Sequence, residues 1–183
     1  MKLSTCITKS LEQNGVDYIF GISAGTCSSL WDSINDTNIK PIITKNEAGA
    51  LYSATNYADA SEKLGVAILG GAVGLNNAIN GIADASRRKL PVFIISGYVN
   101  RHQIGKGAIQ ELNTENIVKS ITKFSKTVIN PDDVLKTIKD AIEIALTPPY
   151  GPVHISIPID VQMSIVSDIV ANEFIKSDRK SVV

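Results

Sequence analysis

Glu47 stands at a position where a carboxyl group can do chemistry. It follows the apolar residues 39–44 and opens an alanine-rich stretch over residues 46–60, so we expect it in the first turn of a helix that comes directly after a strand. A glutamate there can simply stabilise the positive end of the helix dipole. If its side chain instead faces a cleft, it can share a proton with a bound ligand. The residues alone leave both interpretations open.

Glycines follow several apolar segments and predict turns where the backbone can approach a ligand closely. Gly25 comes soon after residues 17–22, and residues 70–74 (Gly-Gly-Ala-Val-Gly) come directly after residues 66–69. The second cluster matches neither the dinucleotide-binding fingerprint nor the Walker pattern, because no Gly-Lys-Ser/Thr follows it. For Gly25, a plain strand-to-helix turn remains an alternative to a ligand-binding turn.

Few residues are available for metal or disulfide chemistry. The chain has two cysteines, Cys6 and Cys27, and two histidines, His102 and His154, which are too few for a disulfide framework or for a metal site of the usual spacing. We therefore expect no metal site in this chain. His102 lies in a polar stretch and is interpreted as an exposed loop residue. His154 lies inside an apolar segment and is interpreted as a hydrogen-bonded core residue.

Length and composition are those of an ordinary globular domain. The 183 residues are 44% hydrophobic and 20% charged, which allows one domain with a sizeable core. Lys and Arg together number 18, as do Asp and Glu, so no net field attracts nucleic acid or a membrane surface. No apolar stretch is as long as a signal-peptide core or a membrane span. We expect a reduced, cytoplasmic protein that binds neither nucleic acid nor membrane.

Helical and extended segments alternate along the chain. The clearest helix start is Asn130-Pro131, because Asn is a good cap and Pro fits the first turn. Pro41 predicts that its strand lies at an edge of the sheet or starts late, and residues 98–120 read as a long loop or a set of short turns. We expect strands at residues 17–22, 39–44, 66–69, 91–97 and 152–158, and helices at residues 3–11, 28–34, 46–60, 75–86 and from 131 until Pro148.

This alternation, without hairpin signals, predicts parallel strands joined by right-handed crossovers. The expected fold is α/β, a three-layer α/β/α sandwich with a mostly parallel sheet. We expect residues 1–163 to form this domain, and residues 164–183 to form a C-terminal helix with a basic tail or the start of a linker. In such folds ligands bind beyond the carboxyl ends of the strands. The functional rim is then predicted to comprise residues 21–25, 45–47, 70–74 and 97–110.

Five stretches of sequence lie on this rim or beside it. They are residues 11–22 with Gly25, Leu30 and Asp32; Asn-Glu-Ala-Gly-Ala at 46–50 with Tyr57-Ala58; residues 77–85; Arg-His-Gln-Ile-Gly at 101–105 with Gln110-Glu111 and residues 121–123; and residues 151–158 with Asp-Val-Gln at 160–162. In order and spacing, over about residues 5–163, they resemble the N-terminal, pyrimidine-binding domain of thiamine-diphosphate-dependent enzymes of the acetolactate synthase type.

The resemblance implies that the chain binds the pyrimidine half of thiamine diphosphate. In this family the glutamate that matches Glu47 hydrogen-bonds a pyrimidine ring nitrogen and so promotes loss of the thiazolium proton, which makes Glu47 both a catalytic and a cofactor-binding candidate. Gly25, Gly74 and Asn77 match cofactor-binding positions. Gln110, a second catalytic candidate, matches a glutamine that points into the active site of a neighbouring subunit. An exposed loop residue is the alternative for Gln110.

The sequence departs from the family pattern at several positions on the rim. Ser23 and Ala24 replace a Pro-Gly pair, Val73 stands where the family has a proline, and Ile109 replaces a phenylalanine. The last change leaves the shape of the substrate pocket open. Together, the changes motivate one alternative function, a non-catalytic relative that uses the fold only for assembly.

The chain lacks the Gly-Asp-Gly motif with which the family binds the cofactor's diphosphate and magnesium. The resemblance therefore implies a partner, a diphosphate-binding domain of the same or another chain that holds the magnesium, within a homodimer or higher oligomer. We expect catalysis only with that partner, as a carboligase or decarboxylase acting on a small 2-oxo acid such as pyruvate. The remaining alternative is the small subunit of a split 2-oxo acid decarboxylase of the sulfopyruvate type.

Overall fold

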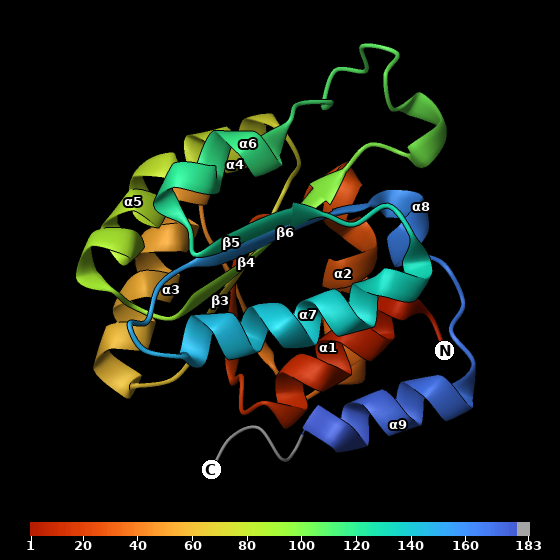
Figure 1. The fold of residues 1–183 in the computed structure, drawn as a ribbon, viewed down its shortest axis with the longest axis horizontal. Coiled ribbons are helices and arrows are strands. Elements are labelled where there is room, and N and C mark those ends of the chain that lie inside the picture. Colours follow the sequence, from red (N-terminus) through yellow and green to blue (C-terminus); the bar gives the residue numbers. More distant parts are fainter. Residues whose placement is uncertain (179–183) are drawn as a thin grey trace.

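The computed structural model of the protein, which describes residues 1–178, has one six-stranded parallel sheet between two layers of helices (Figure 1). The strand order is β2-β1-β3-β4-β6-β5, and every neighbouring pair is parallel. This confirms the predicted three-layer α/β fold. The strands are β1 (Tyr18–Gly21), β2 (Lys40–Ile43), β3 (Gly65–Leu69), β4 (Val92–Tyr98), β5 (Phe124–Thr127) and β6 (Val153–Pro158).

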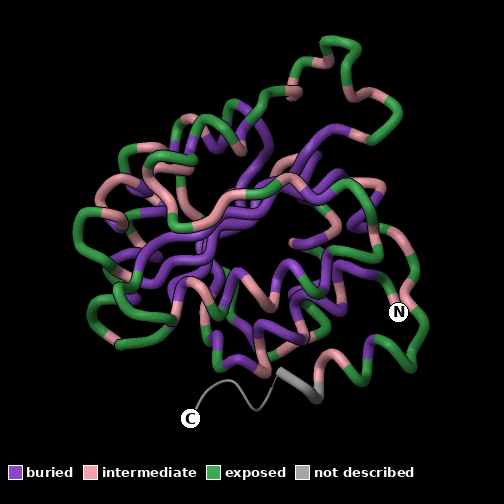
Figure 2. Tube along the Cα trace, in the orientation of Figure 1, coloured by how far each residue is buried: buried purple, intermediate pink, exposed green. Residues whose placement is uncertain are grey.

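The central strands are apolar along their whole length because helices cover both faces of the sheet. Successive side chains of a strand point to opposite faces. In β3, Val66 and Ile68 therefore join one core, whereas Ala67 and Leu69 join the other. Figure 2 shows the result, a buried sheet enclosed by helices whose outer faces are exposed.

The two helical layers differ in size. The larger core lies under α1, α2, α7, α8 and α9, and the smaller one lies under α3 to α6. The first group comprises α1 (Leu3–Gln13), α2 (Ser28–Ser33), α7 (Pro131–Leu146), α8 (Ile159–Gln162) and α9 (Asp168–Asp178); the second comprises α3 (Glu47–Ser61), α4 (Val73–Asn77), α5 (Ile79–Arg88) and α6 (Thr114–Val118).

Most of the predicted elements are present, and the structure makes three corrections to the prediction. The prediction omitted β5 entirely. It treated residues 98–120 as turns, but they also contain α6, which Asn113 caps by accepting a hydrogen bond from the Asn116 N–H at 3.1 Å. The single helix expected over residues 75–86 is divided at Ala78 into α4 and α5. The edge position that Pro41 predicted is confirmed, because β2 is the first strand of the sheet.

The segment after residue 163 packs against the start of the chain. The Leu3 N–H donates to the Ser164 carbonyl at 2.8 Å, and Lys2 pairs with Ile165 in an antiparallel bridge. Ala171 of α9 is fully buried in the larger core. The predicted helix is therefore present, the domain boundary at residue 163 stays a prediction, and the predicted basic end of the tail lies outside the described residues.

Candidate functional site

The segments that follow β1, β2 and β3 converge at one edge of the sheet. From β1 the chain passes to β2 on one side and then crosses to β3 on the other, so the connections diverge between β1 and β3, and in folds of this kind ligands bind at the carboxyl ends of the strands at such a point. The backbones are close here: a Cβ atom on Gly21 would lie 2.1 Å from the Ile68 carbonyl oxygen, and one on Gly70 would lie 2.9 Å from the Ala24 Cβ. Glycine is required at the first of these positions.

Glu47 is the first residue of α3 and lies on this edge, partly exposed. Asn46 caps the helix, because its side-chain oxygen accepts a hydrogen bond from the Gly49 N–H at 2.8 Å. The cap fixes the direction in which the Glu47 side chain leaves the backbone. From α4, the Asn77 Nδ2 donates a hydrogen bond to the Glu47 Oε2 at 2.7 Å.

Gly74 lies against the other oxygen of the same carboxylate. A Cβ atom at Gly74 would stand 3.1 Å from the Glu47 Oε1. Gly74 and Asn77 are three residues apart on α4 and so share one face of that helix. The structure therefore brings together three of the five predicted site residues, with the Glu47 carboxylate between the Asn77 amide and the Gly74 backbone.

Gly25 belongs to a separate turn, the 3₁₀ segment Gly25–Cys27. The next residue, Thr26, holds that turn over the sheet: its Oγ1 accepts a hydrogen bond from the Gly71 N–H at 2.9 Å. A Cβ atom at Gly97 would lie 2.2 Å from the Thr26 carbonyl oxygen, so β4 and the turn meet backbone to backbone. The contact to Gly71 links this turn to the segment that carries Gly74.

Gln110 lines a cavity together with Gly25. The cavity has a volume of about 370 Å³, and Ile109 and Ile159 also form part of its wall. Ile109 is 95% exposed. The structure thus places the predicted residues in two groups, Glu47 with its two neighbours in α4, and Gly25 with Gln110, joined through the Thr26–Gly71 contact.

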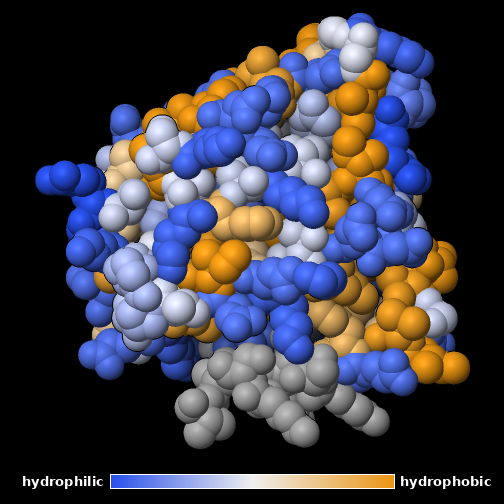
Figure 3. Space-filling view, viewed as in Figure 1, coloured by the Kyte–Doolittle hydropathy of each residue, from blue (hydrophilic) through white to orange (hydrophobic). Residues whose placement is uncertain are grey.

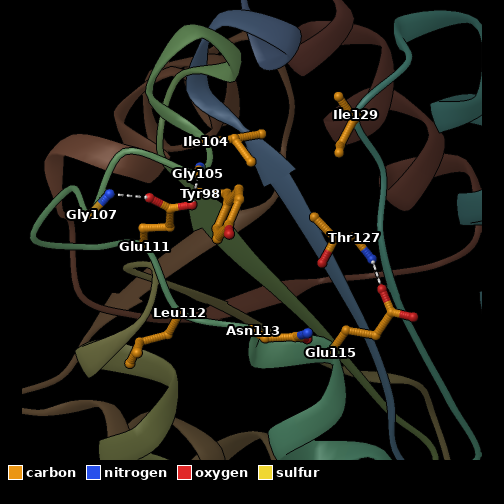
Figure 4. A pocket seen from close by; sticks show the side chains of 10 residues that line it. All are labelled: Tyr98, Ile104, Gly105, Gly107, Glu111, Leu112, Asn113, Glu115, Thr127 and Ile129. Atoms are coloured by element: carbon orange, nitrogen blue, oxygen red, sulfur yellow. Dashed lines mark hydrogen bonds between the residues drawn. The ribbon is translucent and has the colours of Figure 1, made fainter.

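The loop that carries Gln110 is braced by Glu111 (Figure 4). Its carboxylate accepts hydrogen bonds from the backbone N–H groups of Gly105, of Gly107 at 3.0 Å and of Ala108 at 3.3 Å. These donors hold the pKa of Glu111 below its ordinary value. A second cavity of about 670 Å³ lies on the Glu111 side of the loop, where Tyr98 also lines it.

The two histidines lie as the sequence predicted. His102 is exposed in the loop. His154 is fully buried, and its two ring nitrogens are hydrogen-bonded to Ser96 Oγ at 2.8 Å and Ser125 Oγ at 2.9 Å. Burial lowers the pKa of His154 to about 3. A neutral imidazole that donates at one nitrogen and accepts at the other satisfies both hydroxyls.

Sequence reasoning did not identify Thr26 as a site residue. Nothing in its type or spacing distinguishes it from the other threonines of the chain. Its role depends on contacts with residues that are distant in the sequence. Cys27, next to it, is buried as a free thiol, and burial raises its pKa to about 11. That thiol is therefore protonated at neutral pH and is a poor nucleophile.

Residues 1–178 contain neither a metal-binding cluster nor a membrane-spanning helix. No three His, Cys, Asp or Glu side chains among them lie close enough together to hold a metal ion. Similarly, no helix in that part of the chain has both the length and the apolar character needed to cross a bilayer.

Comparison with known proteins identifies the family. A sequence model described as "Thiamine pyrophosphate enzyme, N-terminal TPP binding domain" matches residues 1–117, which is more than half of the chain. The chain belongs to this family. Thiamine pyrophosphate (TPP) is another name for thiamine diphosphate, so the resemblance inferred from the sequence is confirmed.

Curated relatives refine the type of TPP-binding domain. The probable acetolactate synthase large subunit of Methanocaldococcus jannaschii is 36% identical over 162 residues, which cover 88% of this chain and 27% of the relative. The acetolactate synthase large subunit of Lactococcus lactis is 35% identical over 167 residues, covering 91% of this chain and 29% of the relative. The chain is thus an N-terminal TPP-binding domain of the acetolactate synthase-like type, and it spans less than a third of these relatives.

Solved structures share the fold of this TPP-binding domain. The thiamine diphosphate-dependent 4-hydroxybenzoylformate decarboxylase of Rhodococcus jostii RHA1 superposes with a TM-score of 0.89 at 22% identity, over 96% of this chain and 33% of that one. A putative thiamin diphosphate-dependent enzyme from Mycobacterium smegmatis gives a TM-score of 0.81 at 24% identity, over 91% and 34% of the two chains.

Proposed function

We propose that this domain binds the aminopyrimidine half of thiamine diphosphate and that Glu47 activates the cofactor. The observation that carries the proposal is the arrangement of the Glu47 carboxylate, whose Oε2 is held by the Asn77 amide while its Oε1 lies beside the bare backbone of Gly74. A carboxylate that served only the helix dipole would need neither contact.

The residues present fit such a ligand. Gly74 brings no side chain against Oε1, and none of the described residues donates a hydrogen bond to it. Oε1 is therefore the atom that shares a proton with a ring nitrogen, while the hydrogen bond from Asn77 prevents the carboxylate from rotating away. Bound thiamine diphosphate supplies the carbon nucleophile that attacks 2-oxo acids.

We assign the reacting side of the cofactor to the cavity between Gly25 and Gln110. Gly25 has no side chain, and a Cβ atom there would meet nothing within 4 Å, so the backbone of this turn faces open space. The Gln110 side chain lines the same cavity and can donate and accept hydrogen bonds. Relatives named acetolactate synthase support a small 2-oxo acid such as pyruvate as the substrate.

The proposal requires a second domain to bind the diphosphate and its magnesium. Magnesium prefers carboxylate and amide oxygens together with phosphate, and the chain has no Gly-Asp-Gly motif to supply them. Large apolar side chains are exposed around the proposed site, with Ile43 at 63%, Val73 at 65% and Ile109 at 95%. Exposed apolar surface of this kind supports burial against a partner domain. We infer a homodimer or higher oligomer in which this partner completes a carboligase or decarboxylase.

The cysteines support a reducing compartment such as the cytoplasm as the location of the protein. Both lie buried as thiols, and structural disulfides are typical of secreted proteins.

The test measures, by NMR, the rate at which the thiazolium proton exchanges with deuterium in the complex with the diphosphate-binding domain. Glu47→Gln should slow the exchange by about a hundredfold or more, because an acid–base group contributes on that scale. Glu62→Gln is the matched control: it changes the residue that caps the other end of α3, and it should leave the exchange rate unchanged.

Two results would contradict the proposal in different ways. An unchanged exchange rate in Glu47→Gln removes the catalytic role of Glu47. Absence of thiamine diphosphate binding by the wild-type complex would instead favour the assembly-only alternative.

A further inference from the structure

Gln162, the last residue of α8, is fully buried beneath the turn that carries Gly25. Its Nε2 donates two hydrogen bonds of 2.8 Å each, one to the Thr26 carbonyl and one to the Ile157 carbonyl. One side chain thus ties the turn after β1 to the end of β6, although 136 positions separate Gln162 and Thr26 in the sequence.

The orientation of this amide is fixed by its partners. Both N–H groups of Nε2 point at carbonyl oxygens, so rotating the amide by half a turn would place Oε1 against two acceptors. Oε1 itself is buried without a hydrogen-bond partner among the described residues. Leaving a buried acceptor unsatisfied destabilises the fold, and the chain tolerates that cost while keeping both donors on the two carbonyls.

Gln162 completes a three-sided clamp on Thr26. The Gly71 N–H donates a hydrogen bond to the Thr26 hydroxyl at 2.9 Å. The backbone of Gly97 lies against the Thr26 carbonyl, since a Cβ atom on Gly97 would be 2.2 Å from its oxygen. Of these contacts, only the Gln162 amide supplies a hydrogen-bond donor to that carbonyl. Gly25 and Thr26 line the 370 Å³ cavity, as does Ile159 from the same helix as Gln162.

We propose that Gln162 is a positioning residue for the substrate cavity. It fixes the position of the Gly25–Cys27 turn, which lines that cavity, relative to the end of β6. This inference rests on the proposed function, since it takes the Gly25–Gln110 cavity as the place where substrate reacts. Gln162 does not itself line the cavity. It also has no contact with the carboxylate of Glu47, so cofactor activation and turn position are separable.

Two substitutions isolate the two N–H donors. Gln162→Met keeps the length and much of the volume of the side chain but donates no hydrogen bond. In Gln162→Glu, a buried carboxyl facing two carbonyl oxygens favours its protonated form, which has one O–H to donate. Asp160, on the same helix, forms an ion pair with Arg101 at 2.6 Å. It is therefore not available to donate a proton to the two carbonyls in place of the residue at position 162. Thr8→Val is the control, because it removes a buried hydroxyl bonded to the Ser33 carbonyl at 3.1 Å, at the junction of α1 and α2.

The first measurement is backbone hydrogen exchange in the 183-residue chain. In Gln162→Met, the N–H of Gly71, which is bonded to Thr26, should exchange at least about tenfold faster than in the wild type, because the clamp loses its donor. In Thr8→Val, exchange at Gly71 should change only as much as global stability changes. Equal exchange at Gly71 in Gln162→Met and wild type would overturn the proposal.

The second measurement is steady-state turnover of pyruvate by the complex with the diphosphate-binding domain. Gln162→Met should lower kcat/KM by about tenfold to a hundredfold, as expected for a small misplacement of a reacting group, with unchanged affinity for thiamine diphosphate. The ratio of Gln162→Glu to wild-type activity should be highest at acid pH and fall as pH rises and the carboxyl ionises. A ratio that is flat with pH, or a Gln162→Met variant as active as Thr8→Val, would overturn the positioning role.

A failure of the proposed function gives a different result from either of these. If the wild-type complex binds no thiamine diphosphate and turns over no 2-oxo acid, the proposed function fails and the positioning role fails with it. If the wild type is active and only the Gln162 predictions fail, the proposed function stands.

Discussion

At the scale of single residues, the two neighbours of the Glu47 carboxylate, Asn77 and Gly74, determine what it can do. The carboxylate is flanked by an amide donor on one oxygen and a glycine on the other. The sequence alone left two interpretations of this glutamate, because acids are common in the first turn of helices. The decisive partner, Asn77, is 30 residues away in the sequence, and only the resemblance pointed to it. The catalytic role of Glu47 itself stays a prediction until exchange is measured.

Gly74→Ala tests this arrangement directly. The added Cβ would lie 3.1 Å from Glu47 Oε1, so the carboxylate must shift by a few tenths of an ångström, away from the proposed ring nitrogen. We expect thiazolium proton exchange in the complex to slow by about tenfold. The free energy of unfolding should change little, because Ala in a helix is favoured over Gly by about 1 kcal/mol and offsets the close contact.

The matched control for this substitution is Asn80→Ala, which alters an exposed residue of the next helix, α5. It should leave proton exchange at the wild-type rate. Wild-type exchange in Gly74→Ala, with the variant folded, would show that Oε1 is not the oxygen that shares the proton.

At the scale of elements, the sequence predicted those segments whose own residues carry the signal. The caps and spacing of α7 and the apolar runs of β3, β4 and β6 were sufficient, since strands covered on both faces are continuously apolar. Elements whose stability comes from distant contacts were missed. β5 is an edge strand of Phe-Ser-Lys-Thr that is only partly buried, and its sequence resembles a loop. α6 had one usable signal, the Asn113 cap before Glu115.

The break between α4 and α5 also had no visible signal, because Ala78 is a good helix former. The strand order could not be derived either, since it depends on which crossovers pack together. The rule that ligands bind beyond the carboxyl ends of parallel strands predicted the rim, whereas the choice of the site residues on it, and Asn77 beside it, came from the resemblance. How they divide between α4 and the Gly25 turn required the structure.

The loop of residues 101–112, which projects at the top right of Figure 1, is held at residues 105–108 by the Glu111 carboxylate. Hydrophobic side chains are exposed in this region in Figure 3. The Ile109 side chain, for example, is 95% exposed. Burial therefore contributes little to the order of the loop. At residues 105–108 the loop is ordered instead by the hydrogen bonds that Glu111 accepts from the N–H groups of Gly105, Gly107 and Ala108. Charge-assisted bonds of this kind are stronger than neutral ones.

Glu111→Gln should therefore loosen the loop without unfolding the domain. We expect hydrogen exchange at Gly107 and Ala108 to speed up about tenfold at neutral pH. In the wild type the folded-state pKa of Glu111 is depressed. The stabilisation is therefore present above the ordinary carboxyl pKa near 4.5 and is lost as pH falls through the lower, folded-state pKa.

Glu115→Gln serves as the control for the loop. Its carboxylate accepts a hydrogen bond from the Thr127 N–H at 2.7 Å and not from the loop backbone, so exchange at Gly107 should stay at the wild-type rate. Equal protection of the loop in Glu111→Gln and wild type would show that another contact holds it.

At the scale of the whole molecule, two apolar cores hold one rigid sheet, and polar contacts inside that sheet make stability depend on pH. His154 is the second residue of β6, where it joins β4 through Ser96 and β5 through Ser125. A protonated imidazole would bring an uncompensated charge into the interior, and burial therefore depresses its pKa to about 3. The proposed site is at the carboxyl ends of strands of this same sheet, so loss of sheet structure removes it as well.

The unfolded chain binds a proton at His154 below its ordinary pKa of 6.5, whereas the folded chain does not until about pH 3. The free energy of unfolding should therefore fall with decreasing pH across this window, by about 1.4 kcal/mol per pH unit well below 6.5 and by about 2 kcal/mol in total at pH 5. Urea unfolding at pH 7, 6 and 5 measures the slope. His154→Gln, although less stable at pH 7, should lose this part of the slope, whereas His102→Gln, at an exposed position, should keep it. An identical slope in His154→Gln and the wild type would assign the acid sensitivity to other groups.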